Sequence, residues 1–79
     1  MARIIDGSEM NLVGKNVKKL RKQRKMTQRE LSEKLELLGV YVCRGSVSRI
    51  EERVRTVTDI ELYAISSVFG VPVSALFEE

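Results

Sequence analysis

Arginine and serine side chains are concentrated in one short segment, Arg44 to Arg49, whose spacing suits nucleic-acid recognition. Arginine is the residue that most often hydrogen-bonds guanine through paired contacts in the DNA major groove, and each such contact contributes about 1–3 kcal/mol of base discrimination. On a helical wheel, one side of this segment is apolar. The opposite side or its margins hold Arg44, Gly45, Ser46, Ser48, Arg49 and Glu52. We expect Arg44 and Arg49 to contact bases, with Ser46 and Ser48 as lesser contacts; an ordinary solvated surface is the alternative interpretation.

The composition excludes most catalytic chemistry. The 79 residues include no histidine and one cysteine, Cys43, so Ser-His and Cys-His pairs, imidazole zinc sites and internal disulfides are excluded. No glycine-rich phosphate loop is present. We therefore expect no enzyme activity, no cofactor, no metal and no evident small-molecule ligand. For Cys43 itself, a packing residue and an oxidant-sensitive thiol at a helix start both remain open.

Charge is distributed along the chain as a gradient. The net charge is +3, yet residues 56–79 contain no lysine or arginine. Eight basic residues and no acidic one lie between Val13 and Arg29. A polarised surface with one basic face follows, which is suited to an anionic partner such as DNA.

Apolar spacing predicts an all-α single domain of five short helices. The first three are expected at about 11–25, 28–38 and 44–53, the third with Val47, Ile50 and Val54 as its apolar stripe. Capping-box patterns at Thr27 and Thr58 mark the starts of the second and fourth helices, and Gly39 and Gly70 mark their ends. A last helical turn is expected at about 73–77. Residues 1–10 form an N-terminal arm, expected to be flexible, ahead of one domain at 11–79.

The segment from Val13 to Phe77 resembles the Xre-type helix-turn-helix domains of phage lambda repressor and Cro. The matching residues are Leu20-Arg21, Thr27-Gln28-x-Glu30-Leu31-Ser32, Ser46-Val47-Ser48-Arg49-Ile50-Glu51, Thr58 through Gly70-Val71-Pro72-Val73, and Leu76-Phe77. The resemblance implies a lambda-repressor-like fold with the helix-turn-helix in helices two and three. The link between those helices is about five residues longer than the compact family pattern, at Glu36 to Val42.

The resemblance also implies roles for particular residues. In many members an Arg-Glu bridge ties helix one to the recognition helix, and Arg21 and Glu51 occupy those positions. Gln28 stands where the family counterpart bonds a backbone phosphate and braces the recognition helix. The full set of expected phosphate contacts is Thr27, Gln28, Arg29, Cys43 and Arg53.

Together these features predict a cytoplasmic, sequence-specific regulator of transcription that binds double-stranded DNA and has no membrane segment. A repressor of bacterial or phage origin is expected, because no activation or ligand domain is evident. One recognition helix reads few base pairs, so a homodimer on a roughly palindromic site is expected, with Leu76 and Phe77 at its interface. The alternative is a protein-interaction module of the same fold, either antitoxin-like or an anti-repressor.

Overall fold

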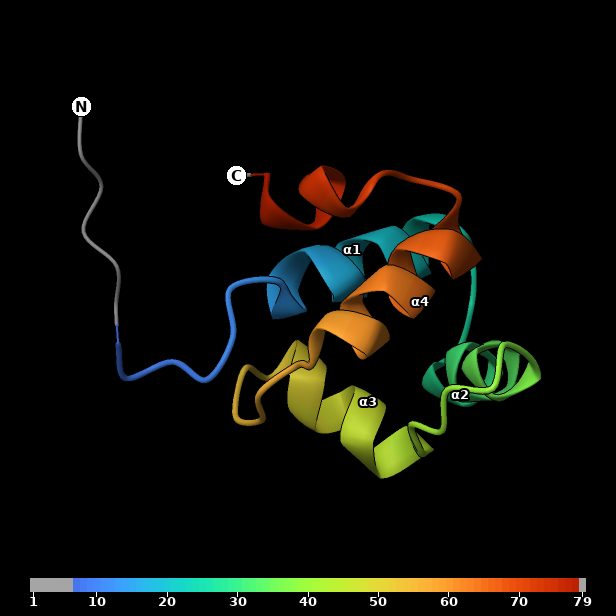
Figure 1. Cartoon of the computed structure of the whole chain (residues 1–79), viewed down its shortest axis with the longest axis horizontal. Coiled ribbons are helices and arrows are strands. Elements are labelled where there is room, and N and C mark those ends of the chain that lie inside the picture. The colour runs from blue at the N-terminus through green and yellow to red at the C-terminus, as the bar shows by residue number, and fades with distance from the viewer. Residues whose placement is uncertain (1–6, 79) are drawn as a thin grey trace.

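Four α-helices and one closing 3₁₀ helix make up the domain (Figure 1). The computed structural model describes residues 7–78. The helices are α1 (Gly14–Gln23), α2 (Gln28–Leu37), α3 (Arg44–Glu51), α4 (Asp59–Phe69) and the 3₁₀ helix η1 (Val73–Phe77). The described residues contain no strand, so the predicted all-α class is confirmed, although the fifth helix is a 3₁₀ turn. Over the same residues, no helix has the length and apolar character needed to cross a membrane.

The predicted caps of α2 and α4 are present. Thr27 and Thr58 each accept a hydrogen bond from the backbone N–H three residues on, and Glu30 and Glu61 each accept one from the capping threonine's own N–H. These reciprocal bonds satisfy amides that have no partner within the helix. Gly70 ends α4 in the left-handed conformation, with a φ of 69°. The sequence therefore located both helix starts correctly.

The third helix is shorter than expected because the chain leaves it at Arg53. This residue has a φ of 63°, in the left-handed region, and the α-helix ends at Glu51. Val54, predicted to complete the apolar stripe, is instead 59% exposed. The stripe consists of Val47 and Ile50, which are both buried.

Helix α3 lies across α1 and α2, and the core forms where these three helices meet α4. The link between α2 and α3 is held to α2, since the Ser32 hydroxyl donates to the carbonyl oxygen of Val42 at 2.6 Å. All four α-helices and η1 contribute to the core. Its buried apolar residues are Val13, Val17, Leu31, Leu35, Val42, Val47, Ile50, Ala64, Ile65, Phe69 and Leu76.

Asn11 joins the start of α1 to the end of α3. Its side-chain oxygen accepts from the N–H groups of Val13 and Gly14 at 3.1 and 2.8 Å. Its amide nitrogen donates to the carbonyl oxygens of Ile50 and Arg55 at 3.1 and 2.8 Å. Because Asn11 takes up these amide groups from outside the helix, α1 begins at Gly14 and not at the expected position 11.

The described part of the expected N-terminal arm, residues 7–10, contacts the end of α3. The Met10 N–H donates to the carbonyl oxygen of Arg53, and the Arg53 Nε donates to that of Asn11 at 2.9 Å. A carboxylate oxygen of Glu9 lies 4.0 Å from the same guanidinium. Positions 1–6 of the arm lie outside the described residues.

Candidate nucleic-acid interface

Helix α3 turns one polar face outward. Arg44, Gly45 and Arg49 are exposed, and Ser46 and Ser48 are partly exposed. Burial of Val47 and Ile50 on the inner side fixes this orientation, because a helix rotated to cover the arginines would expose both apolar side chains. All four expected base-contact residues therefore have solvent-accessible side chains.

The Arg49 guanidinium lies back along α3, over its first turn. Its Nη2 donates to the Ser46 hydroxyl at 3.1 Å. A Cβ placed at Gly45 would lie 3.5 Å from Nη1 of Arg49, so the guanidinium rests against a position that has no side chain. The hydroxyl of Ser46 and the missing side chain of Gly45 thus together position the N–H donors of the Arg49 guanidinium.

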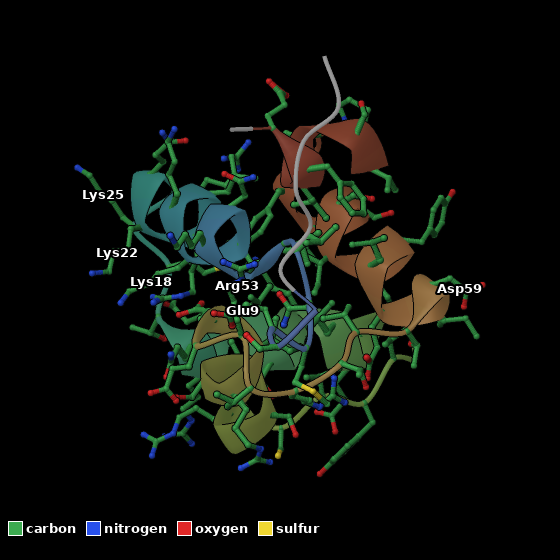
Figure 2. All side chains as sticks on the ribbon, turned by 90° about the vertical axis from the view of Figure 1, so that its left-hand side faces the viewer. Glu9, Lys18, Lys22, Lys25, Arg53 and Asp59 are labelled. Atoms are coloured by element: carbon green, nitrogen blue, oxygen red, sulfur yellow. The ribbon has the colours of Figure 1, made fainter. Side chains whose placement is uncertain are left out.

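A shallow basic groove adjoins the start of α3. Its position brings the expected base contact Arg44 beside the expected phosphate contacts Thr27, Gln28 and Arg29. Figure 2 shows Lys18, Lys22 and Lys25 on one side of the molecule and Asp59 on the other. The residues that line the groove are Arg21, Lys22, Lys25, Met26, Thr27, Gln28, Arg29 and Arg44.

A buried ionic cluster connects this groove to α3. The Arg21 Nε and Nη2 donate to the two carboxylate oxygens of Glu51 at 2.6 and 3.0 Å. The side chains are only 10% and 2% exposed, and the hydrogen bonds that Arg21 donates to Glu51 raise the pKa of Arg21. The Arg21 Nη1 also donates to the carbonyl oxygen of Met26. The implied bridge is therefore present, and it holds the end of α3 against α1.

Gln28 belongs to the same cluster and contacts α3, as the resemblance implies, although the sequence did not indicate Glu51 as its partner. Its amide nitrogen donates to the Glu51 Oε1 at 3.0 Å. Gln28 also lines the basic groove, and its hydrogen bond links the first turn of α2 to α3. Whether it also contacts a phosphate stays a prediction.

The side chains of the other expected phosphate contacts differ in how many contacts they already make within the protein. Arg29 is well exposed and lies 3.7 Å from Glu33. Thr27 is exposed and caps α2. Arg53 is mainly engaged within the protein, since its Nε donates to the carbonyl oxygen of Asn11 and its side chain is 20% exposed. These geometries favour Arg29 over Arg53 as a contact with an outside anion.

Cys43 stands at the N-cap of α3 without making a side-chain cap bond. Its thiol is exposed and lies 3.4 Å from the Ser46 hydroxyl. This hydroxyl is the main cause of the lowered pKa of Cys43. The packing role considered for this residue does not fit its exposure, whereas the predicted phosphate contact requires an accessible position.

Two further contacts that position the site were not found from the sequence. Arg24 donates to the carbonyl oxygen of Phe69 at 3.0 Å and lies over its ring, which ties α1 to the end of α4. Asn11 bridges α1 and α3, as described above. An asparagine just before a helix is a recognised capping signal and could have indicated Asn11. No local pattern indicates Arg24, because its partner is 45 positions away.

The two residues expected at a dimer interface differ in their burial. Leu76 is fully buried and closes the core, whereas Phe77 is 44% exposed. Phe77 lines a small surface pocket of about 250 Å³ beside the start of α1 and the α3–α4 link. Met10 and Leu12, each 50% exposed, line the same pocket. Among residues 7–78, no cluster of three or more potential metal ligands occurs.

The fold and this arrangement of helices define the class of helix-turn-helix domains. The family model for the helix-turn-helix of Cro/C1 type matches residues 17–76, and the chain belongs to this family. Among solved structures, the crystal structure of the DNA-binding domain of BldD is similar, with a TM-score of 0.72 and 22% identity over 94% of this chain and 100% of that chain. Curated protein sequences gave no match. Family and fold together support a DNA-binding regulator.

Proposed function

We propose that this protein is a sequence-specific, double-stranded DNA-binding repressor of transcription that acts in the cytoplasm and reads the major groove with α3. The observation that carries this proposal is the placement of Arg44. This arginine belongs to the exposed face of α3 and also lines the basic groove with Gln28 and Arg29. One surface thus offers donors for base edges next to cations and amides for the phosphate backbone.

The base contacts and the phosphate contacts would have different roles. Arg44 and Arg49, with Ser46 and Ser48, would meet base edges, where arginine donors distinguish guanine. The groove residues would meet phosphates, which fix the register of the helix on the duplex without reading sequence. Lys22 and Lys25 join this second group because they line the same groove.

A homodimer would supply the specificity that a single short helix lacks. We place its interface around Phe77, Met10 and Leu12, because these exposed apolar side chains frame one pocket beside the end of α3. An interface there would adjoin both α1 and the α3–α4 link. Two recognition helices would then have to lie about 34 Å apart to enter successive major grooves on one side of the duplex.

Selection from a random duplex pool tests this function directly. The parent chain should enrich a palindrome, and Arg49→Ala should lose preference at defined positions in each half-site. Binding to the selected duplex should weaken with salt at a log-log slope of about −0.9 per phosphate contacted. Lys25→Ala should reduce that slope without changing the selected sequence. Failure to enrich any sequence, together with binding that is insensitive to salt, would refute the proposal.

A further inference from the structure

Helix α4 exposes two large apolar side chains, Ile60 and Tyr63, besides the apolar residues that it buries. Ile60, Tyr63, Ala64 and Ser67 follow the spacing i, i+3, i+4 and i+7, which places them on one stripe of the helix. Ile60 and Tyr63 are 67% and 69% exposed. A helix that is apolar on more than one side is normally covered on more than one side. Within residues 7–78, Ile60 and Tyr63 on this stripe remain open to solvent, whereas Ala64 is buried.

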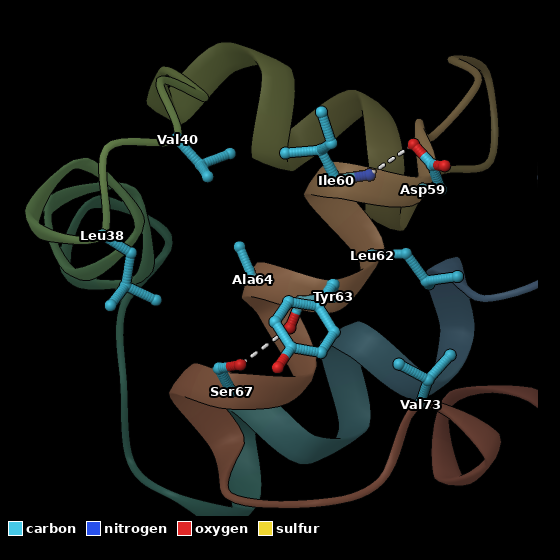
Figure 3. A pocket seen from close by; sticks show the side chains of 9 residues that line it. All are labelled: Leu38, Val40, Asp59, Ile60, Leu62, Tyr63, Ala64, Ser67 and Val73. Atoms are coloured by element: carbon cyan, nitrogen blue, oxygen red, sulfur yellow. Dashed lines mark hydrogen bonds between the residues drawn. The ribbon is translucent and has the colours of Figure 1, made fainter.

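This stripe of α4 forms one wall of a groove of about 630 Å³. Figure 3 shows Leu38 and Val40 on one side of the hollow and Ile60, Ala64 and Tyr63 on the other. Leu38, Ile60 and Tyr63 in these walls are 53%, 67% and 69% exposed. Apolar surface gathered in this way marks interaction sites in soluble proteins.

The groove has a negative end. Asp59 is the one charged residue that lines it. Residues 56–79, which supply α4 and η1, contain no lysine or arginine. On the α2 side, the charged residues that most closely precede Leu38 in the chain are Lys34 and Glu36, whose charges cancel. A matching occupant would therefore be apolar along its length and positively charged where it meets Asp59.

The groove lies apart from the candidate DNA-binding surface. It shares no lining residue with the basic groove that contains Gln28 and Arg44. Figure 2 places Asp59 on the side of the molecule opposite Lys18, Lys22 and Lys25. An occupant of this groove would leave the basic face accessible, so both sites can be filled together.

We propose that the groove between α2 and α4 binds an amphipathic helix of a second protein, with a lysine or arginine of that helix beside Asp59. Helices that dock in this way insert apolar residues spaced as i, i+3, i+4 and i+7. A second copy of this chain fits less well. In a two-fold interface the same surface of both copies meets, so each Asp59 would face the lining of the other groove, which contains no lysine or arginine. This binding site is additional to the proposed DNA recognition.

A displayed library of helical peptides about four turns long tests the proposal. In each peptide, apolar residues occupy one stripe of the helix, and the positions that flank this stripe vary among lysine, arginine, aspartate and glutamate. Selection on the full chain should enrich peptides with lysine or arginine at one end. Ile60→Asp should weaken their binding by at least about tenfold, as expected for an apolar anchor at the centre of an interface. Asp59→Lys should shift the preference to acidic peptides.

Val54→Asp is the matched control, because Val54 is an exposed apolar residue outside the groove. It should leave peptide binding unchanged. All three variants should keep the parent's circular dichroism, and Ile60→Asp should bind the selected duplex as the parent does. The proposal is overturned if no enriched peptide depends on Ile60, if acidic peptides are enriched, or if Ile60→Asp only dissociates a dimer of this chain.

Discussion

Gly14 lies directly against the backbone of Ile50, at the crossing of α1 and α3. A Cβ at Gly14 would come within 2.2 Å of the Ile50 carbonyl oxygen and 2.8 Å of the Arg53 side chain. Backbone cannot move aside as a flexible side chain can, so only glycine permits this separation of the helices. The distance from α1 to the recognition helix is thus set by the absence of one methyl group.

Gly14→Ala should force the two helices apart. Overpacking of this kind costs about 1–3 kcal/mol, and 1 kcal/mol corresponds to about 4–8 °C in melting temperature for a domain of this size. Gly7→Ala is the control, because a Cβ at Gly7 would meet nothing within 4 Å. Thermal unfolding followed by circular dichroism measures both variants. Equal melting temperatures for the two would contradict the close approach.

Glu51→Ala should both destabilise the domain and weaken DNA binding. The substitution leaves the largely buried Arg21 guanidinium without its carboxylate and removes the acceptor of Gln28. Loss of one partner from a buried pair costs about 3–5 kcal/mol. Urea unfolding and titration with the selected duplex measure the two effects. Glu52→Ala is the control, because Glu52 is exposed at the same helix end; similar losses in both variants would remove the bridge from the explanation.

Ser46→Ala should reduce base discrimination more than it reduces overall affinity. Without the hydroxyl, Arg49 loses the hydrogen bond that holds it over the first turn of α3. A hydrogen bond of this type contributes about 0.5–1.5 kcal/mol. We expect a loss of this size in the difference in binding free energy between two duplexes. One is the selected duplex, and the other is altered at the base pair that Arg49 is proposed to contact. Ser46→Thr keeps a hydroxyl and should retain discrimination; a uniform loss on both duplexes would argue against a positioning role.

The Arg55–Glu61 pair should make the domain sensitive to acid. The Arg55 Nη2 lies 2.7 Å from Glu61 Oε2, and hydrogen bonds from Arg55 lower the pKa of Glu61. A carboxyl group whose pKa is lower in the folded state stabilises fully above its unfolded value of about 4.3. This stabilisation is lost as the pH falls from there through the folded pKa.

Unfolding by urea between neutral pH and pH 3 measures this dependence. Glu61→Gln should be less stable than the parent at neutral pH, and the difference should shrink as the pH falls. Glu33→Gln is the control, since Glu33 is mostly exposed and lies 3.7 Å from Arg29. Its difference from the parent should be small throughout. A Glu61→Gln difference that stays constant with pH would show that the ion pair is not its source.

The amino-acid sequence by itself determined the presence of the helices, the starts of α2 and α4, and the outward face of α3. These features depend on neighbours three or four positions apart, so hydrophobic spacing and capping pairs are sufficient to predict them. Thr27 with Glu30 and Val47 with Ile50 are examples. The error at Val54 arose because periodicity cannot show that Arg53 turns into the left-handed conformation.

Apart from the Arg21–Glu51 bridge, which the resemblance implied, only the tertiary structure decided which distant residues meet. Gln28 joins Glu51, Asn11 joins Ile50, and Arg24 joins Phe69, across 23, 39 and 45 positions of the chain. It also separated Leu76, which closes the core, from Phe77, which remains at the surface. These outcomes depend on how the helices dock against one another, and docking follows from side-chain volumes and backbone approach throughout the core, which no local pattern encodes.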